Sequence, residues 1–158
     1  DHRDRTGQGQ YIDLAQSEAS ISFLAPAVLD YTVNGTNAER PGNRHHSMAP
    51  HAVFPAAGDD LWVAIACEDD TQWLALCNAV GLGAEFTGLD LDGRKATEDE
   101  IEGLIAAWTA TKDRADLQEQ LQAIGVACHQ VQNSVDLASD PQLEHRDHFV
   151  LSMTPNAH

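Results

Sequence analysis

The sequence predicts an α/β fold, and two patterns in its middle third carry this prediction. Apolar residues alternate along 61–66, which is typical of a short buried strand. Three amphipathic helical segments follow, and residues 126–131 then return to a strand pattern. A unit of this kind can bury its own core. We therefore expect a complete small α/β domain at 58–133.

Capping signals place the starts of these helices. Asp69 with Gln72 three residues later predicts a capping box, and Thr97 with Glu100 repeats the signal. The last of the three helices is expected to stop at Gly125, because glycine favours the left-handed conformation that ends a helix.

The first 35 residues are expected to supply a strand and a helix to a different domain. A polar, glycine-containing turn at Thr6–Gln10 precedes a predicted strand at 11–14. A largely apolar helix at 17–33 is expected to bend or break at Pro26. This start in mid-fold predicts that the chain is the back part of a longer protein. It also predicts exposed apolar surface on 11–33.

The remaining two stretches connect or continue these units. Residues 36–57 contain several prolines and little apolar periodicity, so they are expected to be a linker loop. Residues 134–158 are interpreted as a return segment toward the first domain. They should contain a short helix and a terminal strand at 149–151.

Composition excludes some classes of partner. The net charge is -16 with only nine Lys plus Arg, so a nucleic-acid partner is not expected. No apolar run reaches the roughly 20 residues of a membrane-spanning helix, and we expect a soluble, cytoplasmic protein without a membrane partner. Cys67, Cys77 and Cys128 lie in apolar patterns and are expected to be reduced and buried.

Several short motifs follow one another along nearly the whole chain. They are Thr6-Gly7-Gln8-Gly9-Gln10 with Ile12-Asp13, Arg40-Pro41-Gly42-Asn43, Ala49-Pro50 with Phe54, Trp62-Val63-Ala64-Ile65-Ala66, Asp70-Thr71-Gln72-Trp73, Gly125-Val126, and Asp140-Pro141-Gln142-Leu143. In this order and spacing they resemble the motifs of the family III CoA-transferases, which include formyl-CoA transferase and the carnitine and bile-acid CoA-transferases.

The resemblance implies a fold and a chemistry. Residues 1–35 would be a late strand and helix of a large Rossmann-like domain, so the chain would hold part of that domain and all of the small one. The full-length protein would be an interlocked homodimer. In the family an Asp attacks the acyl-CoA thioester, and CoA then passes through an aspartyl thioester to an acceptor acid. That Asp would lie upstream of Thr6, so no catalytic residue is assigned and the chain alone is expected to be inactive.

The same resemblance selects candidate substrate-binding residues. Arg40, Asn43 and His45 belong to a loop that borders the active-site cleft in the family, and their side chains suit carboxylate, phosphate or carbonyl groups. Fixing the linker is the alternative role for Arg40 and Asn43. Asp70 is a further candidate, although a helix N-terminus also favours an acidic residue there. The glycine-rich gating loop of formyl-CoA transferase is absent from 43–48.

Acyl-CoA and a carboxylic acid are the expected substrates, and no tightly bound cofactor is expected. His45, His46 and His51 lack a companion carboxylate or Cys at metal-ligand spacing, so no metal site is assigned. Two alternatives to a CoA-transferase stay open. One is a fragment of an α-methylacyl-CoA racemase, which needs an acid and base pair. The other is a noncatalytic binding or assembly domain.

Overall fold

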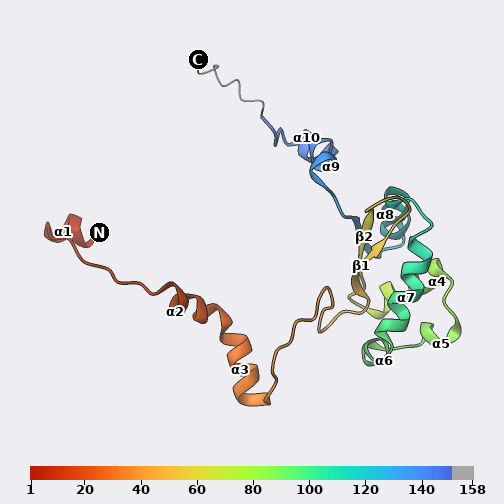
Figure 1. The fold of residues 1–158 in the computed structure, drawn as a ribbon, viewed down its shortest axis with the longest axis horizontal. Helices are drawn as coiled ribbons and strands as arrows, with labels where there is room; N and C mark the ends of the chain where they lie inside the picture. The colour runs from red at the N-terminus through yellow and green to blue at the C-terminus, as the bar shows by residue number, and fades with distance from the viewer. Residues whose placement is uncertain (151–158) are drawn as a thin grey trace. The chain divides into compact units, whose positions relative to one another are not determined.

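The structure of the chain is a computed structural model that describes residues 1–150. The chain divides into two compact units, Asp1–Arg40 and Pro41–His158, and each is described by itself (Figure 1). Within residues 1–150, none of the helices combines the length and the apolar character needed to cross a membrane.

The first unit contains only helices. They are α1 (His2–Thr6), α2 (Gln16–Ile21), the single 3-10 turn η1 (Ser22–Leu24) and α3 (Ala25–Asn34). Pro26 lies in the first turn of α3, where its missing N–H costs no helical hydrogen bond, and Gly35 ends the helix with a φ of 72°. The expected break at Pro26 is confirmed.

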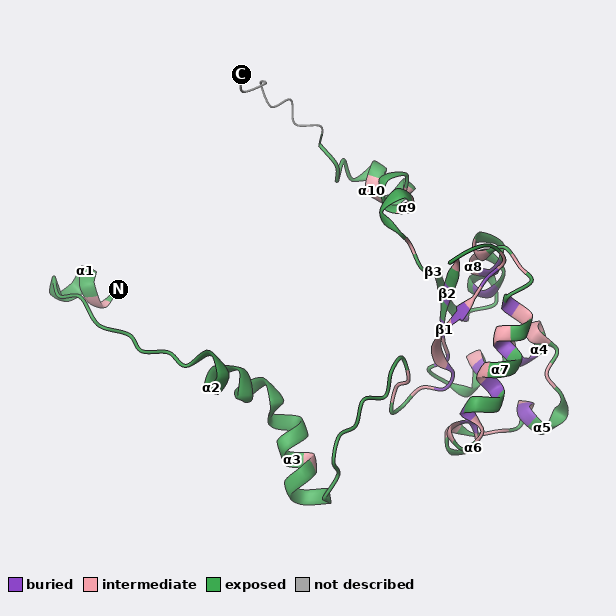
Figure 2. Ribbon diagram, in the orientation of Figure 1, coloured by how far each residue is buried: buried purple, intermediate pink, exposed green. Residues whose placement is uncertain are grey.

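Apolar side chains of the first unit are exposed throughout, as the green ribbon in Figure 2 shows. Phe23, for example, is 87% exposed. The exposed apolar surface predicted for 11–33 is therefore confirmed. The strand predicted at 11–14 is wrong, because these residues are extended but unpaired in the structure. A strand needs a neighbour to accept and donate its backbone hydrogen bonds, and no described segment supplies one.

The second unit is built on a three-stranded antiparallel sheet of order β1-β2-β3. The strands are β1 (His51–Pro55), β2 (Trp62–Ala66) and β3 (Ala127–Gln130), so the strands predicted at 61–66 and 126–131 are confirmed. The expectation of an irregular linker over all of 36–57 is wrong for 51–55, which form β1. Pro50 and Pro55 argue against a strand in this part of the sequence, but proline is tolerated at the end of an edge strand.

Helices cover one face of this sheet and enclose the core. The long helices are α4 (Asp70–Val80), α7 (Glu98–Thr109) and α8 (Arg114–Ala123). They bury apolar side chains against the inward-facing residues of β1, β2 and β3, namely Trp73, Leu76, Cys77, Ile101, Ile105, Leu117 and Leu121 against Phe54, Val63, Ile65 and Cys128. Burial of each large apolar side chain stabilises the fold by about 1.5–3 kcal/mol.

All three cysteines of the chain lie in this core as free thiols, as the sequence analysis expects. Burial raises the pKa of the Cys67 thiol to about 12 and the pKa values of Cys77 and Cys128 to about 11 each. A thiol that stays protonated is a poor nucleophile, so these residues pack rather than react.

The capping predictions are partly right. Asp69 accepts a hydrogen bond from the backbone N–H of Gln72, but the Gln72 side chain accepts from the N–H of Glu68 rather than that of Asp69. Thr97 makes no capping bond, because its hydroxyl donates to the Gly93 carbonyl at the end of the preceding helix.

Four short helices complete the second unit. Three were not predicted, α5 (Ala84–Thr87), α6 (Leu91–Ala96) and α10 (Pro141–His145), and all three are too short to show a clear apolar period. The short helix expected after 134 is α9 (Ser134–Ala138), and α10 follows it. Phe149 and Val150 are not in a strand, and Leu151, the last residue of the predicted strand, lies outside the described residues.

Candidate functional site

The candidate site is built on the loop of residues 41–50, which leads into β1. Gly42 has a φ of 65°, a conformation that favours glycine, and lets the chain turn at the start of the loop. At the other end Ala49 and Pro50 are buried, and the Pro50 carbonyl accepts a hydrogen bond from the N–H of Cys67. The loop is thus fixed at its exit by the core.

Arg44 fixes the middle of the loop to the N-terminal turn of α7. Its guanidinium donates to both carboxylate oxygens of Glu102, at 3.1 and 2.7 Å, and also to Asp99. Oε2 of Glu98 lies 3.6 Å from Nε of Arg44, so three carboxylates surround the guanidinium. The hydrogen bond to Glu102 is the main cause that raises the pKa of Arg44 above its ordinary value, followed by the one to Asp99. Bidentate pairs of this kind fix orientation as well as distance.

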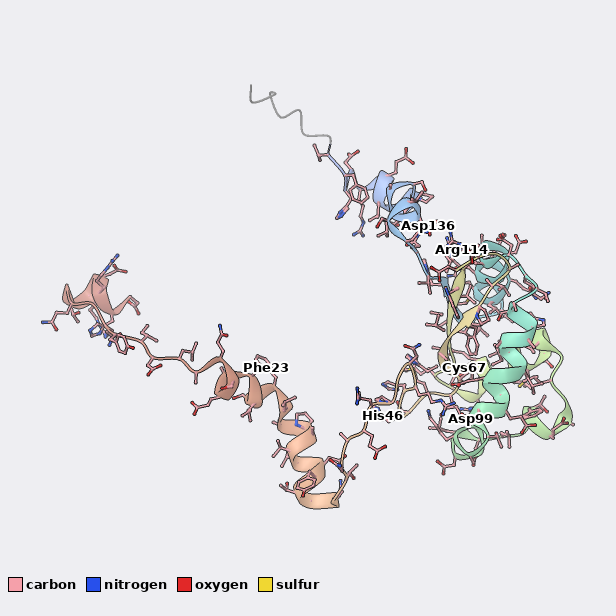
Figure 3. All side chains as sticks on the ribbon, viewed as in Figure 1. Phe23, His46, Cys67, Asp99, Arg114 and Asp136 are labelled. Atoms are coloured by element: carbon pink, nitrogen blue, oxygen red, sulfur yellow. The ribbon has the colours of Figure 1, made fainter. Side chains whose placement is uncertain are left out.

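A tight turn presents the histidines of the loop. His45 and Met48 form an isolated antiparallel bridge, with His46 and Ser47 at the tip. The backbone N–H of Ser47 donates to Nδ1 of His45 at 3.3 Å. Figure 3 shows His46 on this turn and Asp99 on the neighbouring helix.

The face of the sheet opposite the helices forms one wall of a cavity of about 610 Å³. Small residues floor this cavity, among them Ala64, Ala66 and Ala127 of β2 and β3. Gly42, Asn43 and Arg44 of the loop line it as well, as do His51 and His129 at the sheet. An apolar floor with a few polar groups at its edge is the usual make-up of a small-molecule site.

A second cavity, of about 390 Å³, shares Arg44 with the first and is lined by Pro41, Arg44, His45, His46 and Lys95. We call it the histidine cavity. The ring centroids of His45 and His46 are 4.3 Å apart, and those of His45 and His51 are 5.4 Å apart. Desolvation, followed by the positive charges of His46, His51 and Lys95, lowers the pKa of His45.

The structure brings Asn43 and His45 together on this loop. The backbone carbonyl of Asn43 accepts a hydrogen bond from Nδ1 of His51, and Asn43 also lines the larger cavity. Arg40 is the last residue of the first unit, and its side chain is exposed. Asp70 lies in the first turn of α4, away from the loop in sequence, and its Oδ1 accepts from Nη1 of the buried Arg94 at 2.7 Å.

Sequence reasoning missed Arg44 and Lys95 and considered His51 only as a metal ligand. The acidic residues at 98–102 were the available signal, because a cluster of carboxylates attracts a cationic side chain. No local sequence rule pairs it with a residue more than 50 positions upstream, however. Among the described residues, His, Cys, Asp and Glu side chains form no group of three or more with an arrangement that could hold a metal ion.

Comparison with known proteins agrees with the motif order. A family model described as CoA-transferase family III matches residues 1–158. The succinyl-CoA:mesaconate CoA-transferase of Haloarcula marismortui is 36% identical over 149 residues, which are 92% of this chain and 36% of the relative. The succinate–glutarate CoA-transferase of Agrobacterium fabrum is 29% identical over 148 residues, 92% of this chain and 36% of the relative.

A solved structure has a similar fold. The crystal structure of a CAIB/BAIF family protein from Brucella suis matches with a TM-score of 0.71 and 28% identity. The match covers 92% of this chain and 39% of that protein. The chain thus spans little more than a third of the length of the relatives it matches, and its mixed α/β fold is theirs.

Proposed function

Because the chain belongs to CoA-transferase family III, we propose that it is the part of a CoA-transferase that carries the small domain and one wall of the substrate cleft. The reaction moves CoA from an acyl-CoA to a carboxylic acid, and CoA thioesters are substrates rather than bound cofactors. The protein in its full-length form is proposed to be a homodimer.

The domain assignment is part of this proposal. Residues 1–35 would belong to a large Rossmann-like domain, 36–57 to the linker, 58–133 to the small domain and 134–158 to the return segment. Because β1 pairs with β2, residues 51–55 are structurally part of the small domain, so the linker function is proposed for the preceding residues.

The observation that carries the proposal is the anchored loop beside the sheet cavity. Arg44 and Pro50 hold the loop, so Asn43 has a defined position next to the apolar floor and His45 has one in the histidine cavity. A preorganised loop of this kind suits an acyl group, whose chain needs apolar surface and whose carbonyl or carboxylate needs a donor. We propose Arg40, Asn43, His45 and Asp70 as substrate-binding residues.

No catalytic residue is assigned to the chain. The buried thiols are protonated, and the carboxylates of Glu98, Asp99 and Glu102 are held in ion pairs with Arg44. A nucleophilic carboxylate is therefore proposed to come from outside these residues, and turnover is proposed to require it. The chain by itself should give no measurable transfer of CoA.

The test uses the enzyme that contains this chain. Purified enzyme is incubated with succinyl-CoA and a panel of acids, and product thioesters are separated by chromatography. Formation of a new acyl-CoA with release of succinate is expected. Substitutions Asn43→Ala and His45→Gln should raise KM for the acid or the thioester about tenfold, the loss of one hydrogen bond to a charged group.

Two outcomes would oppose the proposal. Exchange of the α-proton of a 2-methylacyl-CoA in D₂O, without transfer of CoA, would favour the racemase. If the folded protein catalyses neither reaction with any substrate, a noncatalytic binding or assembly domain is favoured.

A further inference from the structure

We infer that His45, His46 and His51 together bind a carboxylate group, namely the carboxylate that stays free when a dicarboxylic acid forms its CoA thioester. This inference rests on the proposed function and assigns a ligand chemistry to one part of its site. It adds His46 and His51 as specificity-determining residues.

The first argument is geometry. The ring centroids of His46 and His51 lie 4.3 and 5.4 Å from that of His45. His45 and His46 line the histidine cavity together with Lys95, and His51 lines the neighbouring larger cavity. A carboxylate has two acceptor oxygens and four lone-pair sites, so it can accept from more than one ring at this spacing. The loop that bears the rings is held in place by Arg44, so the group does not have to be ordered at the moment of binding.

The second argument is the state of the ring nitrogens. Nδ1 of His45 accepts from the Ser47 N–H, so the hydrogen of its neutral ring is on Nε2, where it is available to a ligand. Nδ1 of His51 faces the Asn43 carbonyl, which can only accept, so that nitrogen is the donor, and Nε2 of His51 can donate to a carboxylate once the ring has taken up a proton. Within residues 1–150, neither Nε2 has a hydrogen-bond partner.

The third argument is the local charge. The cations Arg44 and Lys95 and the carboxylates Glu98, Asp99 and Glu102 all face this region. Each carboxylate is already paired with Arg44 or Lys95. The charges that act on His45 are positive, since His46, His51 and Lys95 all lower its pKa. An anion that replaces this repulsion with attraction is favoured, and its binding should be accompanied by proton uptake by the rings.

The fourth argument is the chemistry of the substrates. The relatives from Haloarcula and Agrobacterium are named for succinate, mesaconate and glutarate, each of which has two carboxyl groups. When one carboxyl group reacts, the other keeps its charge and must be held away from the apolar floor of the neighbouring cavity. The histidine cavity adjoins that floor through Arg44, which lines both.

The test follows the histidine ring signals of the ¹³C-labelled chain by NMR from about pH 5 to about pH 8 at constant ionic strength. Succinate, butyrate and inorganic phosphate are titrated in separate experiments. Succinate is expected to shift the signals of all three rings and to raise their titration midpoints by about half a pH unit, as linkage to proton uptake requires. Butyrate should shift the same ring signals, because the rings hold one carboxylate and butyrate supplies one.

Variants separate the site from general charge effects. His46→Gln and His51→Gln should each weaken succinate binding about threefold to tenfold, the loss of one charge-assisted hydrogen bond. His145→Gln, an exposed histidine on α10, is the matched control and should leave binding unchanged. Equal responses to phosphate and succinate, or an equal effect of the control variant, would overturn the inference.

Turnover distinguishes this inference from the proposed function. In the enzyme that contains the chain, the variants should raise KM for dicarboxylic acids more than KM for monocarboxylic acids. If transfer of CoA occurs and that ratio does not change, the carboxylate site is wrong and the proposed function stands. If the chain binds succinate through these rings but the enzyme transfers no CoA, the proposed function is wrong and the carboxylate site stands.

Discussion

The guanidinium of Arg94 is 1% exposed, and its Nη1 lies 2.7 Å from Oδ1 of Asp70, a side chain that is 75% exposed. The same nitrogen donates to the Leu89 carbonyl at 3.0 Å, and the guanidinium carbon lies 5.7 Å from the centre of the Trp73 ring. Asp70 thus pairs with the buried guanidinium of Arg94, which lies beside the core residue Trp73. This pair links the start of α4 to α6.

This pair predicts unequal costs for its two members. Arg94→Ala should lower the free energy of unfolding by about 2–4 kcal/mol, because it removes buried packing and leaves the Leu89 carbonyl without its donor. Asp70→Asn should cost only about 1 kcal/mol, because the exposed carboxylate is screened by water. Urea unfolding followed by tryptophan fluorescence measures both. The exposed Arg146→Ala is the control, and a cost for Arg94→Ala no greater than for this variant would contradict the prediction.

The loop anchor gives a second prediction. Arg44→Leu should increase amide hydrogen exchange in residues 44–48, because the bidentate contact to Glu102 and the contact to Asp99 are lost together. Exchange in β2 and α8 should stay slow, since the core is unchanged. Arg44→Lys should give an intermediate result, because a lysine supplies the charge without the planar fork.

The comparison variant is Arg114→Leu. It removes an arginine of α8 that also donates two hydrogen bonds to one carboxylate, that of Asp136. Its effect should be confined to α9. If both variants increase exchange throughout the second unit, Arg44 supports the whole fold and not the loop alone.

The pair of Arg114 with Asp136 predicts a pH dependence (Figure 3). Its two hydrogen bonds, at 2.9 and 2.6 Å, are the main cause that lowers the pKa of Asp136 below its ordinary value of 3.8. A carboxyl group with a lowered folded-state pKa stabilises the fold above its unfolded pKa and loses this effect as the pH falls. The NMR titration midpoint of the Asp136 carboxyl should therefore lie below 3.8 and rise toward it in Arg114→Leu. An unchanged midpoint in the variant would show that the backbone N–H of Asn133 is the main cause.

The three buried thiols predict slow chemical modification. Because burial raises the pKa of Cys67 to about 12 and the values of Cys77 and Cys128 to about 11, almost no thiolate is present at pH 8. A thiol reagent should label none of the three in the native chain and all three in urea. Ser139→Cys, at an exposed position, is the positive control and should react at once. Rapid labelling of a native cysteine would show that the core opens locally.

Much of the second unit could be predicted from the sequence because its signals are local. The alternation at 61–66 and the apolar faces of α4, α7 and α8 follow from the periods of two and 3.6 residues that strands and helices impose. Gly35, Gly81 and Gly125 end their helices with positive φ, as the residue type indicates. The order of the motifs also identified the family.

Only the tertiary structure decided the partners of residues that are far apart in the chain. The strand at 51–55 exists because it pairs with β2, whereas 11–14, with a better strand pattern, have no partner among the described residues. In the site, Asn43 and His45 could be selected from their motif. The contacts of Arg44 with α7, of Arg94 with Asp70 and the gathering of the histidines could not, because hydrogen bonds and ion pairs depend on distances that folding sets and that no local pattern encodes.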